Sequence, residues 1–212
     1  MISTAPKSER LASAVQYAAD AHAGQVRKRS QGDDRPPIRY LSHLLGVAGI
    51  VAEDLGTDDE IIAGLLHDVL EDQDPDGTRA VEINDKFGPE VLVMVESASG
   101  PKKEDAGMRE FRVRKQVYLN QLQAEQHPGA IKVSLADKVH NARSTVNDLE
   151  AEGPAVWDRF NAGVDDQLWW YGGLAEVYAA HATAGRASTA RAAELARLVA
   201  RMGELSTLTA SR

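Results

Sequence analysis

Helical periodicity runs through nearly the whole chain, and the alternating runs of β-branched residues that are typical of strands are missing. Apolar residues recur three and four positions apart, as on the buried face of an amphipathic helix. The sequence therefore predicts an all-α fold. Its 212 residues, 43% of them hydrophobic, suffice for the core of one domain. We place that domain at residues 1–185, followed by a C-terminal helical extension at residues 186–212.

Local signals divide the chain into expected helices. The capping-box spacing of Thr57 and Glu60 marks one helix start, Pro89 suits a first helical position, and Gly56 marks a helix end. Segments 24–39 and 99–107, which are charged and rich in Gly and Pro, are expected to be loops. The expected helices are residues 8–22, 40–55, 57–72, 80–87, 89–97, 108–124, 130–149, 165–180 and 188–205.

Composition limits both the chemistry and the partners of this chain. The absence of cysteine excludes thiolate catalysis and thiolate ligands, so a metal must be held by His, Asp, Glu or Asn. A net charge of −8 argues against indiscriminate binding to nucleic acid or to an anionic membrane. Neither a signal peptide nor an apolar run of about 18 residues is visible. We expect a soluble, cytoplasmic protein, and the sequence leaves its oligomeric state open.

The densest polar cluster is LLHDVLED, at residues 65–72. On a continuous helix, His67 would share a face with Glu71, and Asp68 would share one with Asp72. Acidic side chains at a helix C-terminus oppose the helix dipole unless a cation offsets them. The alternative is a solvated, charged helix end, but the pattern favours a metal or catalytic site.

Two further residues gain weight only in combination with this cluster. Taken singly, Asp137 in SLADKVHNAR is typical of a surface residue, and His43 in YLSHLLGVA is typical of a core histidine. Two His and two Asp together form a nitrogen and oxygen ligand set that suits Mn²⁺, Fe²⁺ or Mg²⁺.

The segments HAGQVRK, YLSHLLGVA, IAGLLHDVLEDQ, FGPEV and SLADKVHNAR, in this order, resemble the HD superfamily. More narrowly, they resemble the hydrolase domain of the RelA/SpoT alarmone enzymes and the small single-domain alarmone hydrolases. The resemblance covers about residues 11–177 and implies a compact HD-domain helical bundle of about eight to ten helices.

The resemblance also implies roles for individual residues. It makes Glu71 and Asp72 the acid/base candidates near an attacking water. The implied Mn²⁺ ligands are His43, His67, Asp68 and Asp137. The implied substrate contacts are Arg27, Lys28, Lys115, Asn141 and Tyr171, with Lys102, Lys103 and Arg112 as further basic residues and Trp169 and Trp170 beside the tyrosine. The alternatives are solvated basic residues and aromatic rings that belong to the core.

The resemblance implies hydrolysis of the nucleotide polyphosphate (p)ppGpp at its 3′-diphosphate, the reaction that ends the stringent response. Three departures from the family pattern flank the substrate site and leave the nucleotide open. They are the longer loop at residues 29–39, Leu44 in place of a proline, and SGPKK in place of an acidic segment. The alternatives are an HD-type phosphomonoesterase acting on a dNMP or NADPH, and a non-catalytic nucleotide sensor.

Overall fold

The computed structural model describes residues 7–28, 34, 36–101, 107 and 109–207. Within these ranges the structure contains ten α-helices, one 3₁₀ helix and a single isolated bridge between Val26 and Arg39. The all-α prediction and the expected number of helices are confirmed. None of the helices in the described part of the chain has the length and apolar character needed to span a membrane.

The chain divides into two units by its internal contacts. The first unit comprises Met1–Val26, Ile38–Gly100 and Glu125–Asp137. The second comprises Arg27–Pro37, Pro101–Ala124 and Lys138–Arg212. The helix α8 (Pro128–Glu152) is continuous and contributes its first turns to the first unit and the rest to the second.

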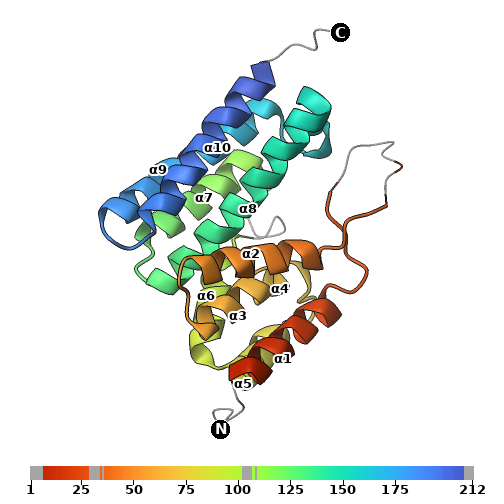
Figure 1. The fold of residues 1–212 in the computed structure, drawn as a ribbon, viewed down its shortest axis with the longest axis vertical. Helices are drawn as coiled ribbons and strands as arrows, with labels where there is room; N and C mark the ends of the chain where they lie inside the picture. Colours follow the sequence, from red (N-terminus) through yellow and green to blue (C-terminus); the bar gives the residue numbers. More distant parts are fainter. Residues whose placement is uncertain (1–6, 29–33, 35, 102–106, 108, 208–212) are drawn as a thin grey trace. The chain divides into compact units, whose positions relative to one another are not determined.

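The first unit is built around α3 (Asp58–Leu66), which packs against α1, α2 and α6 (Figure 1). Its other helices are α1 (Lys7–Ala21), α2 (Leu41–Glu53), α4 (Val69–Asp72), α5 (Arg79–Phe87) and α6 (Pro89–Ala98). The core consists of aliphatic side chains without exposed surface, among them Val47, Ile62, Leu66, Val91 and Ile131. Because α3 packs against three other helices, the residues that follow its C-terminal end are held in a fixed position.

A glycine allows α2 and α3 to pack closely. A Cβ atom added to Gly64 would lie 3.3 Å from Cα of Ala48, which is tighter than ordinary van der Waals contact. Gly64 therefore sets the separation of the two helices near their contact point.

The start of α3 is fixed by the predicted capping box. The hydroxyl of Thr57 accepts the N–H of Glu60 at 3.2 Å, and the Glu60 carboxylate accepts the N–H of Thr57 at 2.7 Å. The same carboxylate accepts a 2.7 Å bond from Nζ of Lys132 at the beginning of α8. The N-terminus of α3 is thus attached to α8 within the first unit.

The prediction of one continuous helix over residues 57–72 is wrong. The helix α3 ends at Leu66, and the one-turn helix α4 begins at Val69, with His67 and Asp68 between them. The ring of His67 turns back to bond the carbonyl of Gly64, and Asp68 has φ −96° and ψ −3°. Long-range contacts of these two side chains, described below, override the local helical propensity.

The second unit is an arrangement of long helices. The helix α9 (Val164–Thr183) packs against α7 (Phe111–Ala124) and α10 (Thr189–Thr207), and α10 also contacts the 3₁₀ helix η1 (Gly153–Arg159) (Figure 1). The predicted C-terminal helix therefore exists, and it buries Ala192, Leu195, Met202 and Leu205. The domain boundary at residue 185 stays a prediction.

Candidate metal centre

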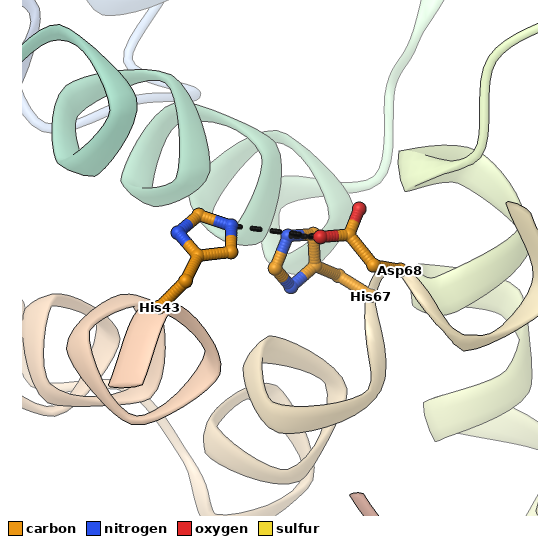
Figure 2. A group of neighbouring side chains, drawn as sticks. All are labelled: His43, His67 and Asp68. Carbon is orange, nitrogen blue, oxygen red and sulfur yellow. Dashed lines mark ion pairs between the residues drawn. The ribbon is translucent and has the colours of Figure 1, made fainter. Parts of the chain in front are cut away.

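Four side chains of the first unit converge on a small volume. His43 lies in the first turn of α2, His67 and Asp68 lie in the turn after α3, and Asp137 lies on α8. Figure 2 shows the rings of His43 and His67 directed toward the carboxylate of Asp68.

The distances make this a symmetrical cluster. Nε2 of His43 lies 3.2 Å from Oδ1 of Asp137 and 3.5 Å from Oδ2 of Asp68. Nε2 of His67 lies 3.1 Å from Oδ2 of Asp68 and 3.5 Å from Oδ1 of Asp137. Both imidazole nitrogens therefore face the same two carboxylate oxygens, as ligands around one central cation would.

The cluster is buried on most sides. The exposed fraction is 1% for His43, 3% for His67 and 5% for Asp137. The Asp68 side chain is 18% exposed, so it marks the accessible side. Two carboxylates in such surroundings lose hydration and need positive charge to offset that loss.

The hydrogen bond of the His67 ring on the side away from the cluster fixes which ring nitrogen carries the proton. Nδ1 of His67 lies 2.9 Å from the carbonyl oxygen of Gly64, which can only accept, so Nδ1 carries the proton. Nε2 of His67 is buried and has no hydrogen-bond partner among the described residues. It presents a lone pair to two carboxylate oxygens, an arrangement that only a bound cation or a proton stabilises.

The electrostatics of His67 and Asp68 agree with this requirement. Burial would lower the pKa of His67, but the carboxylates of Asp68 and Asp137 raise it well above its usual value. Burial would raise the pKa of Asp68, but the neighbouring imidazoles of His67 and His43 lower it well below its usual range. The cluster thus attracts positive charge.

A tyrosine orients the carboxylate of Asp68. The hydroxyl of Tyr40 donates a 2.6 Å hydrogen bond to Oδ2 of Asp68. Burial, followed by the negative charge of Asp68, raises the pKa of Tyr40 far above its usual value, so this hydroxyl remains a donor. Outer bonds of this kind, Tyr40 to Asp68 and His67 to Gly64, are typical of metal sites because they fix ligand orientation.

The residues present fit a divalent metal ion. Two imidazole nitrogens and two carboxylate oxygens are a ligand set used by first-row divalent cations, and the orphaned Nε2 of His67 supplies the lone pair that such an ion needs. The cluster could leave coordination positions for other oxygen ligands on the side where Asp68 is exposed.

The acid/base candidates lie on α4, directly after the cluster. Glu71 and Asp72 are both exposed. Oδ2 of Asp72 accepts a 2.8 Å hydrogen bond from Nε2 of Gln25. The carboxylate of Asp72 is therefore held in place by a residue from the loop after α1.

Two of the expected substrate contacts meet in the second unit. Nη2 of Arg27 donates a 3.0 Å hydrogen bond to Oδ1 of Asn141. Nζ of Lys28 lies 6.0 Å from the ring centroid of Phe160.

The remaining basic and aromatic candidates form pairs of their own. Nζ of Lys115 lies 4.6 Å from the centroid of Trp170, and Arg112 lies over Trp169 and bonds Asp166 at 2.6 Å. Tyr171 is only 8% exposed, which favours the alternative that its ring belongs to the core. Lys102 and Lys103 lie outside the described residues.

Sequence reasoning missed Tyr40, Gln25 and His22, which support the candidate site. His22 is 4% exposed, stacks on Tyr40 with 5.1 Å between ring centroids, and lies 2.6 Å from Oε1 of Gln25. All three lie in the segments HAGQVRK and YLSHLLGVA, which carry the family resemblance, but the sequence does not show the neighbours on which their roles depend.

The fold and the cluster together define a class: an all-helical protein with a buried site of two histidines and two aspartates for a divalent cation. The family model described as HD domain matches residues 14–166. The chain belongs to this HD-domain family, and its identification as an HD-type phosphohydrolase is confirmed.

Relatives point in the same direction. The mouse guanosine-3′,5′-bis(diphosphate) 3′-pyrophosphohydrolase MESH1 is 32% identical over 155 residues, which cover 71% of this chain and 75% of MESH1. A GTP pyrophosphokinase of Myxococcus xanthus is 33% identical over 144 residues, 66% of this chain but only 17% of that larger protein. The solved structure of a metazoan ortholog of SpoT that hydrolyses ppGpp matches 95% of this chain and 99% of its own, with TM-score 0.70 and 23% identity. This last likeness shows the shared fold.

Proposed function

We propose that this chain is a metal-dependent (p)ppGpp 3′-pyrophosphohydrolase, which releases pyrophosphate from ppGpp or pppGpp and leaves GDP or GTP. The observation that carries the proposal is the similarity to MESH1 over 71% of this chain and 75% of the relative. The His/Asp cluster supports it, because it gathers the residues that phosphohydrolysis in this family requires.

The reaction is a displacement at phosphorus. A water oxygen forms a bond to the phosphorus attached to the ribose 3′ oxygen, the bond from that phosphorus to the 3′ oxygen breaks, and the 3′ oxygen gains a proton. Asp72 or Glu71 accepts the proton that the water loses. Their position one turn after Asp68, at the exposed end of α4, suits this role.

His43, His67, Asp68 and Asp137 would hold the cation. We infer that it is Mn²⁺, with Fe²⁺ and Mg²⁺ as alternatives, from the family resemblance. A divalent cation bound there polarises phosphoryl oxygens and makes water more acidic. Tyr40 and the carbonyl of Gly64 hold Asp68 and His67 in orientation for it. A cytoplasmic location, without nucleic acid or membrane as partner, is part of the proposal.

Nucleotide contacts are proposed for polar side chains of the second unit. Arg27, paired with Asn141, offers hydrogen-bond donors for phosphate or base. Lys28 and Lys115 add positive charge. Tyr171 contributes mainly by packing, given its burial.

A substrate panel tests the proposed function. Mn²⁺-loaded protein is incubated with ppGpp, pppGpp, NADPH and dNMPs, and pyrophosphate and orthophosphate are assayed separately. Pyrophosphate from ppGpp, absent with His67→Ala, is the expected result. Orthophosphate from NADPH or a dNMP would move the function to a phosphomonoesterase, and nucleotide binding without turnover would identify a sensor.

The acid/base assignment has its own test. Asp72→Asn and Glu71→Gln are expected to lower kcat by about 10²- to 10⁴-fold where the residue transfers the proton, with metal content unchanged. Asp85→Asn, which alters an exposed carboxylate on α5 of the same unit, is the matched control and should leave kcat unchanged. A variant with full kcat would remove its residue from the proton-transfer role.

A further inference from the structure

A hydrogen-bonded amide network centred on Gln25 holds the carboxylate of Asp72. Gln25 donates from Nε2 to Oδ2 of Asp72 at 2.8 Å, and its Oε1 accepts from Nε2 of Gln73 at 2.6 Å. Nδ1 of His22 lies 2.6 Å from the same Oε1. One glutamine side chain thus connects three residues that come from two separate segments of the first unit.

The chemistry of the partners fixes the direction of every bond in this network. An ionised carboxylate only accepts, so the NH₂ group of Gln25 must face Asp72 and its oxygen must face the other way. That oxygen only accepts, so Nδ1 of His22 carries a proton and donates. A flipped Gln25 amide would place oxygen against oxygen at Asp72 and NH₂ against two donors. The network therefore has one low-energy orientation.

The backbone around Gln25 is fixed as well. The N–H of Gln25 bonds the carbonyl of His22 at 3.0 Å, and the carbonyl of Gln25 accepts the N–H of Tyr40 at 3.0 Å. The ring of His22 is buried and stacks on Tyr40 at an interplanar angle of 18°. The support for Asp72 is therefore anchored in the core, although Asp72 itself is exposed.

Asp72 needs such support more than the buried residues of the His/Asp cluster. It is the last residue of a four-residue helix, and an exposed Asp side chain at such a position would otherwise sample several rotamers. A proton acceptor must stay within hydrogen-bond reach of the water that it serves. Loss of the Gln25 bond would spread the carboxylate over positions in which it does not act.

We propose that Gln25 is a positioning residue that holds Oδ2 of Asp72 so that Oδ1 faces the attacking water, and that His22 fixes the orientation of the Gln25 amide. This inference rests on the proposed function, in which Asp72 takes the proton of the water. Gln25 acts through Asp72 and has no contact with the reacting atoms.

The test replaces the amide without changing the shape of the side chain. Gln25→Met is expected to lower kcat by about ten- to a hundredfold, the range found for outer residues that orient a reactive group, and to change KM less than about threefold. Gln16→Met is the matched control, because Nε2 of Gln16 also donates to an aspartate, Asp20, at 2.9 Å on the exposed face of α1. The control should retain the full kcat.

A double variant separates positioning from a general loss of structure. In the Asp72→Asn background, Gln25→Met should cause no further loss of kcat, because its effect passes through Asp72. Losses that multiply would overturn the proposal, as would a rise in KM at unchanged kcat. Full kcat in Gln25→Met, with wild-type protein active on ppGpp, would overturn the proposal and leave the proposed function intact.

A crystal structure of Gln25→Met provides a readout that needs no substrate. The expected result is an Asp72 carboxylate displaced or spread over several rotamers, with His43, His67 and Asp68 unmoved. An Asp72 side chain in its original position would overturn the inference. Inactivity of the wild-type protein on ppGpp would instead count against the proposed function, so the two failures are distinguishable.

Discussion

The His/Asp cluster of the first unit and the cation–aromatic pairs of the second unit hold their charged groups by different means. The His/Asp cluster consists of His43, His67, Asp68 and Asp137. The cation–aromatic pairs are Lys28 with Phe160, Arg112 with Trp169, and Lys115 with Trp170. The His/Asp cluster uses short side chains with two rotatable bonds, largely buried and held by hydrogen bonds such as that from Tyr40 to Asp68.

The cation–aromatic pairs use long side chains whose charged ends lie over aromatic rings at 4.6 to 6.0 Å from the ring centroids. Such contacts contribute about 0.5–1 kcal/mol at exposed sites and tolerate movement. The contrast indicates that the His/Asp cluster supplies fixed geometry, whereas the cation–aromatic pairs can adapt to a ligand. Changes in the first should abolish turnover, and changes in the second should alter affinity.

The largest expected effect comes from breaking the His/Asp cluster. His67→Ala should reduce the bound metal to near zero and lower kcat/KM by about a thousandfold, which corresponds to the several kcal/mol that a metal ion supplies to the transition state. Metal content by mass spectrometry and turnover of ppGpp are the measurements. His127→Asn, a change to a histidine that pairs with Glu90 instead, should keep both values. Retention of stoichiometric metal in His67→Ala would contradict the assignment.

Removal of the metal should affect stability as well as activity. Mn²⁺ at about 100 times its Kd is expected to add about 2.7 kcal/mol to the free energy of unfolding. For a chain of this size that raises Tm by about 5–10 °C, measurable by calorimetry before and after chelation. Lys115→Met should show the same increase, and His67→Ala should show none. An equal increase in all three proteins would place the binding elsewhere.

The close packing of α2 on α3 can be tested with two glycines. Gly64→Ala should lower the free energy of unfolding by about 1–3 kcal/mol because the added methyl meets Ala48, and it should weaken metal binding by separating His43 from His67. Gly49→Ala is the control, since its Cβ would meet no atom within 4 Å; this helical substitution should stabilise by about 0.5–1 kcal/mol. Urea unfolding and Mn²⁺ titration give both quantities, and unchanged metal affinity in Gly64→Ala would show that the spacing is not critical.

Removal of one charge from the cation–aromatic pairs should have a smaller effect, confined to substrate binding. Lys115→Met should raise KM for ppGpp by about tenfold, the equivalent of about 1.4 kcal/mol, with kcat nearly unchanged. Lys86→Met removes a comparable contact, 5.8 Å above the ring of Tyr17 in the first unit, and should leave KM unchanged. Steady-state kinetics of the two variants decide the matter. A fall in kcat without a change in KM would assign Lys115 to the reaction rather than to binding.

Much of the fold follows from local signals in the sequence. The capping box at Thr57 and the proline at position 89 mark helix starts because their effects act within one turn. The break between α3 and α4 could not be predicted in this way. The backbone there follows the side chains of His67 and Asp68, whose partners lie on α2 and α8. Long-range contacts determine that turn, and no local propensity encodes them.

The candidate site also contains residues that the sequence identifies and residues that only long-range contacts identify. His43, His67, Asp68 and Asp137 could be selected from the sequence because their chemistry sets them apart from an apolar background. Gln25 and Tyr40 could not, because both are uncharged, and their partners Asp72 and Asp68 lie 47 and 28 residues away. The role of such residues depends on a spatial neighbour rather than on their own chemistry.

The helix α3 is joined to α8 at two points. Glu60 of its capping box bonds Lys132, and His67 after its last turn faces Asp137. A slip of α8 by one residue along its axis would break both attachments at once, so the register that brings Asp137 to the cluster is specified twice. The 9 residues of α3 span about 13 Å, at 1.5 Å per residue. A metal ion bound at the C-terminal end of α3 should therefore reduce fraying of its N-terminal end. Slower hydrogen exchange of the Glu60 amide in the metal-bound protein would show this.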